Sequence, residues 1–171
     1  LPYHFMDIAN YGAILEATNH LFSLGHKRIA FINGLKGRSF AEDRDRGYRD
    51  AHRAANIPVD PALLGNGEFT DDMGFQIMSR LLALPERPTA VLAGSMMSAL
   101  GAMRAIRTTG LKLGQDVSLI AHDDVFPYIS GDHMVPTISV TRSSMRAAGV
   151  RIGEMLIDIL SGEHTGWFNE V

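Results

Sequence analysis

The clearest pattern in the chain lies between residues 88 and 124, where two apolar runs flank a stretch with helical spacing. Residues 90–93 and 117–121 show no polar alternation, which is typical of strands covered on both faces. Apolar side chains between them recur at helical spacing: Met97, Leu100, Met103 and Ile106. Gly110 then supplies a left-handed stop. The pattern predicts a strand, a helix and a second, parallel strand joined by a right-handed connection.

The same alternation continues on both sides of this unit. Strands are expected at residues 28–32, 63–67 and 138–141, with an incomplete strand at 167–171. Helices are expected at four places: residues 12–25, from Ser39, from Thr70, and from Ser144 to Gly162. Ser39 and Glu42 have the spacing of a capping box. We therefore expect an α/β fold, a parallel sheet with helices on both faces.

Polar residues follow both strands of the 88–124 unit. Ser95 comes after the first strand, and Asp123 comes after the second. Because ligands of open parallel sheets bind outside the carboxyl ends of the strands, these two residues are the first site candidates.

Composition excludes several classes of function. The 171 residues suit one ordinary domain, and the 46% hydrophobic and 20% charged shares are those of a globular protein. A net charge of -3 without a basic stripe gives no footprint for direct binding of nucleic acid. No apolar run approaches the ~18 residues of a membrane span. The chain begins at Leu1 and has no signal-peptide pattern, so we expect a fragment of a longer protein.

The sequence motifs of common catalytic and cofactor-binding sites are missing or incomplete. Residues 34–37 lack the ending of a phosphate loop, and Ser95 does not lie in a G-x-S-x-G elbow. The absence of cysteine excludes thiolate chemistry and cysteine-ligated metals. Acidic and histidine residues gather near one strand end: His122, Asp123, Asp124, Asp132 and His133. A loop-lining role suits them better than a metal, so neither metal nor cofactor is expected.

Six motifs together resemble the lactose-repressor (LacI/GalR) family of transcriptional regulators. They are GAILEATNHLFSLGHKRIAFING, RDRGY, FTDDMGF, PTAVLAGSMMSALGAMRAI, GQDVSLIAHDD and PTISVTR, and they occur in the order that the family has. The resemblance covers nearly the whole chain. It implies a periplasmic-binding-protein-like type I fold, in which two Rossmann-like lobes close on a small molecule.

The resemblance also implies how the chain is divided and what it binds. Residues 1–138 would be one lobe of the effector-binding domain, with a lobe-crossing segment at 1–11, and residues 139–171 would return to a missing first lobe. The expected effector is a sugar, and DNA would be bound only through a missing N-terminal helix-turn-helix head. We expect a cytoplasmic homodimer that pairs through the helix near residues 97–108 and the loop near His133, with no membrane partner.

Five ligand-binding residues are carried over from the family motifs. Arg44 matches an arginine that contacts the effector, Phe69 an aromatic residue over the ligand, and Asp123 an aspartate that accepts hydrogen bonds from ligand hydroxyls. Ser95 retains a polar contact, whereas Met96 stands where an acidic residue is usual, which indicates a different effector or a repacked pocket floor. Asp7 matches a position in the crossing segment, where a hinge role is favoured over a ligand contact.

Two other classes of function remain open. A secreted solute-binding protein of a sugar transporter would share the fold and the cleft chemistry. An α/β hydrolase-type enzyme would use Ser95, His122 and Asp123, although no oxyanion hole is recognisable. The residue sequences of the motifs favour a transcriptional regulator, which is not an enzyme.

Overall fold

The computed structural model describes residues 4–122, 136–162 and 168–170. The chain forms two compact units. Leu1–Ala9 and Ser143–Val171 make up the first unit, and Asn10–Arg142 makes up the second.

The second unit is built on a five-stranded sheet with the order β3-β2-β4-β5-β6. Its strands are β2 (Ile29–Asn33), β3 (Leu64–Asn66), β4 (Ala90–Ala93), β5 (Ser118–His122) and β6 (Ser139–Thr141). Every neighbouring pair is parallel. The predicted parallel α/β sheet is therefore confirmed.

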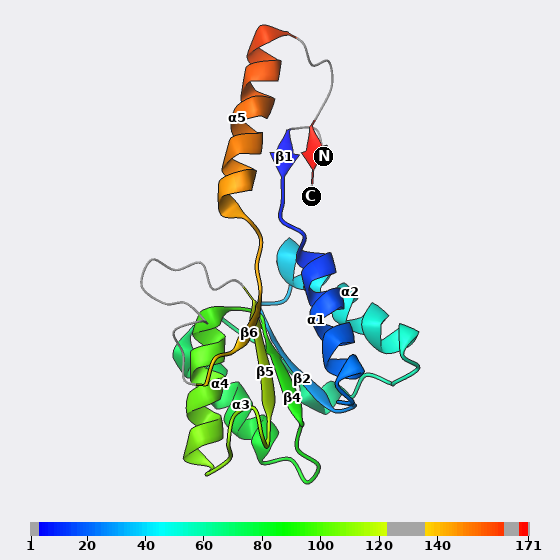
Figure 1. Cartoon of the computed structure of the whole chain (residues 1–171), viewed down its shortest axis with the longest axis vertical. Helices are drawn as coiled ribbons and strands as arrows, with labels where there is room; N and C mark the ends of the chain where they lie inside the picture. The colour runs from blue at the N-terminus through cyan, green and yellow to red at the C-terminus, as the bar shows by residue number, and fades with distance from the viewer. Residues whose placement is uncertain (1–3, 123–135, 163–167, 171) are drawn as a thin grey trace. The chain divides into compact units, whose positions relative to one another are not determined.

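Helices cover both faces of this sheet, as Figure 1 shows. α1 (Asn10–Ser23) and α2 (Ser39–Ala54) pack against each other on one face, and α3 (Asp71–Leu82) and α4 (Met96–Thr108) pack together on the other. A short 3₁₀ turn, Pro61–Leu63, leads into β3.

Alternate residues of each central strand enter opposite halves of the core. Ala30 and Ile32 face the cluster with α3 and α4, whereas Ile29 and Phe31 face the cluster with α1 and α2. All residues of β2 and β4 are buried. This explains the absence of polar alternation in the sequence, because both faces of the strands are covered.

α2 is anchored to the sheet by aromatic side chains. Tyr48 is fully buried, stacks on Phe31 at 5.1 Å between ring centroids, and donates a hydrogen bond to the Ile29 carbonyl at 2.7 Å. His52 packs beside Tyr48, and its Nδ1 lies 3.1 Å from the Ile57 carbonyl oxygen. Its Nε2 is buried without a hydrogen-bond partner among the described residues. Burial lowers the pKa of His52, so the neutral ring is favoured.

The helix ends follow the sequence at most positions. Thr70 and Ser144 accept hydrogen bonds from Met73 N–H and Ala147 N–H, as expected of N-caps. The capping-box prediction at Ser39 is wrong. Arg38 is the N-cap residue of α2, because it is the last residue with an extended backbone before the helix. Its side chain makes no capping hydrogen bond.

Arg80 covers the outer edge of the sheet. β3 is an edge strand, and the Arg80 guanidinium donates to the carbonyl oxygens of Ala62 and Leu64 at 3.0 and 2.8 Å. Outward carbonyls that an open edge would leave to solvent are thus hydrogen-bonded within the unit.

The first unit contains one helix and a pair of short strands. β1 (Phe5–Met6) pairs in parallel with β7 (Asn169–Glu170), and α5 (Met145–Ser161) ends at Gly162, which has φ 75°. The predicted last strand is therefore present at 169–170, while Trp167 and Val171 lie outside the described residues. Large apolar side chains of α5 are exposed: Met145, Val150, Ile152, Leu156, Ile157 and Leu160.

Candidate functional site

The direction of the chain connections reverses between β2 and β4. β2 continues through α2 to β3 on one side, whereas β4 continues through α4 to β5 on the other. The carboxyl ends of these adjacent strands meet at Gly34 and Gly94, and Gly94 N–H donates to the Ile32 carbonyl at 2.8 Å. Such a switch point is where open α/β sheets bind ligands.

Two phenylalanine rings lie directly over these strand ends. Phe40 comes from the first turn of α2 and Phe69 from the loop before α3, with their centroids 5.8 Å apart. A Cβ atom on Gly34 would lie 2.7 Å from the Phe40 ring, and one on Gly94 would lie 3.2 Å from the Phe69 ring. A side chain at either position would push the rings outward, so the two glycines let the rings approach the backbone this closely.

A small open cavity adjoins the rings. It measures about 180 Å³ and is lined by the β2–α2 loop and the loop before α3: Gly34, Leu35, Arg38, Phe40, Gly67, Glu68 and Phe69. Phe69 is half-buried, so its ring is not part of the closed core. A flat apolar ring at a cavity wall suits the C–H face of a sugar or a heteroaromatic ring.

Arg44 lies beneath the two rings and is only 5% exposed. Its Nε donates to Asn10 Oδ1 at 2.8 Å, and its Nη1 donates to the Gly94 carbonyl at 2.8 Å. Its Cζ lies 5.1 Å from the Phe40 centroid and 5.6 Å from the Phe69 centroid. The structure thus brings Arg44 and Phe69 together, and the hydrogen bonds to Asn10 and Gly94 are charge-assisted.

Ser95 and Met96 occupy the other side of the strand end. Ser95 caps α4 by accepting from Ser98 N–H at 3.1 Å, and its hydroxyl lies 3.0 Å from Ser98 Oγ. Met96 is fully buried in the core with α3. Both interpretations of this departure, a larger or less hydroxyl-rich ligand and a repacked pocket floor, stay predictions.

The described structure does not test the other two predicted site residues, Asp7 and Asp123. Asp7 belongs to the first unit, and its Oδ1 accepts from Ile8 N–H at 2.7 Å. Asp123 lies outside the described residues. His122 is buried with its Nδ1 2.8 Å from Thr141 Oγ1. The ligand contacts of all five residues remain predictions.

Phe40 was missed by the sequence analysis as part of this site. It precedes Arg44 by four residues on the same helix, a spacing that places side chains next to each other. That spacing was the available signal. Asn10 was assigned only to the crossing segment, and its hydrogen bond to Arg44 has no signal in the sequence.

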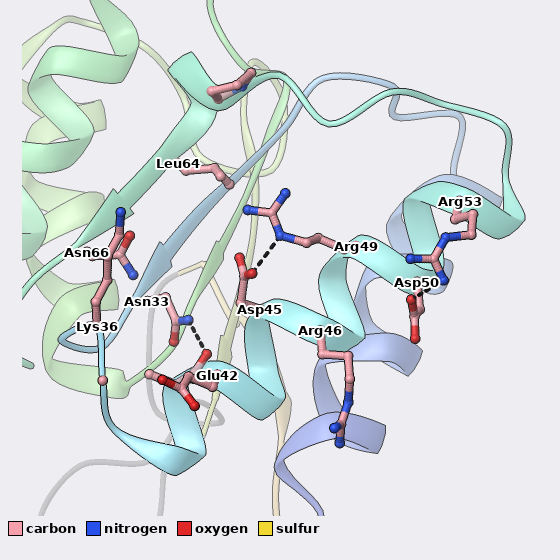
Figure 2. Close-up of a pocket in the computed structure, with 13 residues that line it drawn as sticks. Asn33, Lys36, Glu42, Asp45, Arg46, Arg49, Asp50, Arg53, Leu64 and Asn66 are labelled. Carbon is pink, nitrogen blue, oxygen red and sulfur yellow. Dashed lines mark hydrogen bonds and ion pairs between the residues drawn. The ribbon is translucent and has the colours of Figure 1, made fainter.

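A larger groove of about 660 Å³ lies between α2, the β2–α2 loop and the edge of β3 (Figure 2). Figure 2 shows Asp45 and Arg49 pointing toward each other, 2.6 Å apart, and Arg53 pairs with Asp50 at 2.6 Å. The hydrogen bond to Asp45 raises the pKa of Arg49. Since these charges neutralise one another at an exposed face, we interpret the groove as a hydrated helix surface.

Neither a metal cluster nor a membrane helix is present in the part of the chain that the structure describes. No group of three or more histidine or acidic side chains there could hold a metal ion. Within the same residues, every helix is too short or too polar to cross a bilayer.

The fold and the switch-point site define a ligand-binding lobe, and comparison with known sequences identifies its family. Residues 18–166 match the periplasmic binding protein-like domain, and the chain belongs to this family. A relative is the "HTH-type transcriptional regulator AglR" of Rhizobium meliloti (strain 1021), 44% identical over 155 residues. The match covers 91% of this chain and 44% of AglR, so the chain spans less than half of that relative.

Solved structures of LacI-family regulators have the same fold. A regulatory protein of the LacI family from Chloroflexus aggregans is 29% identical with a TM-score of 0.92, covering 98% of this chain and 60% of that one. The complex of the transcriptional regulator CelR with cellobiose is 31% identical with a TM-score of 0.89, covering 99% and 51%. The relatives named here are regulators and not enzymes.

Proposed function

We propose that this chain is the effector-binding part of a LacI-type transcriptional regulator, and that a sugar is its effector. The observation that supports the proposal best is the switch-point site, where Phe40 and Phe69 lie over a buried Arg44 beside a cavity. The similarity to AglR and to the CelR–cellobiose complex supports the class of protein and the class of ligand.

The proposed ligand contacts divide between apolar and polar groups. The Phe69 ring faces the C–H side of a sugar ring. Arg44 offers N–H groups that do not already donate to Asn10 and Gly94, and Asp123 offers an acceptor for hydroxyl groups. Ser95 offers its hydroxyl from the start of α4, and Asp7 contributes from the crossing segment. Because the acidic side chain at position 96 is replaced by a buried methionine, the number of hydroxyl acceptors is reduced on this side.

A second lobe and a DNA-binding head complete this proposal. Residues 139–171 would return to a first lobe that precedes this chain in the full regulator, as residues 1–11 would leave it. The exposed apolar face of α5 supports this assignment, since the side chains of Ile157 and Leu160 are 66% and 77% exposed. An exposed apolar patch of this kind is typical of a surface that packs against another part of the protein or a partner. DNA would be bound in the cytoplasm by the helix-turn-helix head alone.

We also propose that two copies pair through α4. Apolar side chains of α4 and the segment after it border a surface cavity of about 520 Å³, among them Leu100, Met103, Ile106, Leu111 and Leu113. The loop near His133, the other expected contributor, lies outside the described residues. Equilibrium sedimentation should give a dimer, and Met103→Glu should give a monomer.

Two alternatives predict different results. A secreted solute-binding protein would carry a secretion signal, and no DNA would respond to its ligand. A hydrolase would show turnover that Ser95→Ala abolishes, although the Ser95 hydroxyl is here part of a helix cap.

The decisive experiment titrates the intact regulator with a panel of mono- and disaccharides that includes cellobiose. One sugar should raise the melting temperature and change the affinity for operator DNA. Phe69→Ala should weaken that sugar at least about tenfold, whereas Phe75→Ala, an equally half-buried ring on α3, should not. Equal losses in both variants, or a panel without any binder, would contradict the proposal.

A further inference from the structure

Arg44 connects the elements that border the candidate site. It belongs to α2, its Nη1 holds the Gly94 carbonyl at the end of β4, and its Cζ lies under the rings of Phe40 and Phe69. Its Nε–H is directed at Asn10 Oδ1, at 2.8 Å. The orientation of this single planar group therefore affects two helices, a strand end and the cavity wall together.

Asn10 is placed where the chain enters this lobe. It is the first residue of α1 and of the second unit, and it directly follows the segment Leu1–Ala9 of the first unit. Asn10 is only 2% exposed, which is unusual for a polar residue at the start of a helix. Its side chain is accordingly directed inward, toward the guanidinium of Arg44.

The physical chemistry makes this contact consequential. A buried guanidinium needs acceptors in fixed directions, because its N–H groups lie in one plane and cannot turn separately. Without the Asn10 acceptor the Nε–H loses its 2.8 Å hydrogen bond, so one of the contacts that fix the guanidinium plane beside the two rings is removed.

From these contacts we propose that Asn10 is a positioning residue. It fixes the Arg44 guanidinium, and through Arg44 it couples the start of α1 to the carboxyl end of β4. The part that concerns ligand affinity rests on the function proposed above. The part that concerns the orientation of Arg44 does not, and the experiment measures the two parts separately.

The orientation is measured by hydrogen exchange of the Arg44 Nε–H, followed by ¹⁵N NMR. We expect slow exchange in the wild type, at least about tenfold faster exchange in Asn10→Ala, and recovered protection in Asn10→Asp, whose carboxylate keeps an acceptor. Asn19→Ala, an exposed asparagine on the same helix, is the matched control and should behave as the wild type. A purely structural role in α1 would not give this rescue.

The coupling is measured by titration of the intact regulator with cellobiose as the probe. Asn10→Ala should weaken binding about tenfold, and Asn10→Asp should restore most of it. Unchanged exchange in Asn10→Ala, or faster exchange with unchanged cellobiose affinity, would overturn the proposal. If Asn10→Ala does not fold, rapid exchange of the Arg44 Nε–H in Asn10→Asp would equally overturn the proposal. A wild type that does not bind cellobiose while Asn10→Ala accelerates exchange counts against the sugar and supports the positioning role.

Discussion

α3 and α4 approach each other closely because glycine lies at their crossing. A Cβ atom on Gly101 would lie 1.9 Å from the Asp71 carbonyl oxygen and 2.5 Å from the Phe75 nitrogen. Both neighbours are backbone atoms of α3, so no side chain can move aside. Gly101→Ala therefore forces the two helices apart.

The magnitude follows from two opposing effects. Alanine in place of glycine stabilises a helix by about 1 kcal/mol. Overpacking costs about 1–3 kcal/mol, and the upper value applies here because backbone must shift. We expect Gly101→Ala to lower the free energy of unfolding by about 2 kcal/mol, whereas Gly12→Ala, where a Cβ atom meets nothing within 4 Å, should raise it by about 0.5–1 kcal/mol.

Urea unfolding and thermal melting of the two variants measure this difference. For a chain of this size about 2–4 °C corresponds to 1 kcal/mol, so a difference of about 2.5–3 kcal/mol should separate the melting temperatures by about 5–12 °C. If Gly101→Ala were as stable as Gly12→Ala, the close helix crossing would be refuted.

Other variants test a helix cap, a buried tyrosine and a buried histidine. Thr70→Ala should lower the free energy of unfolding by about 1 kcal/mol in urea, and Thr70→Ser should not, because the hydroxyl still accepts from Met73 N–H. Tyr48→Phe should cost about 1–2 kcal/mol, since the buried Ile29 carbonyl loses its donor; an unchanged urea midpoint would contradict this. Burial lowers the pKa of His52 below 6.5. The unfolded chain then binds a proton that the folded chain resists, so stability falls as the pH drops below about 6.5. His52→Gln should flatten that dependence, and an unaltered slope would exclude His52 as its source.

Much of the fold was predictable because buried segments have clear patterns of apolar residues and helix ends have glycine. The apolar runs at 90–93 and 117–121 predicted β4 and β5 to within one residue, since strands covered on both faces are mostly apolar. Gly25, Gly110 and Gly162 lie at the predicted helix ends, with φ of 88°, 78° and 75°. The left-handed conformation itself was predicted for Gly110. Local chemistry determines these features, so one sequence suffices to find them.

The site was predictable only in part. Arg44 and Phe69 were placed in it through family motifs, because nothing in a helix sequence shows that one arginine points inward. The contact between Asn10 and Arg44 joins residues 34 positions apart, and only the packing of α1 on α2 brings them together. The start of α2 was assigned one residue late, because arginine at position 38 has no capping preference that a sequence pattern could register.

The guanidinium of Arg80 has a consequence for how copies of this lobe meet. With the carbonyls of Ala62 and Leu64 already bonded, a foreign strand docking beside the start of β3 would have to displace an arginine to use either acceptor. Arg80 thereby opposes growth of the sheet from one molecule into the next at this point of its edge.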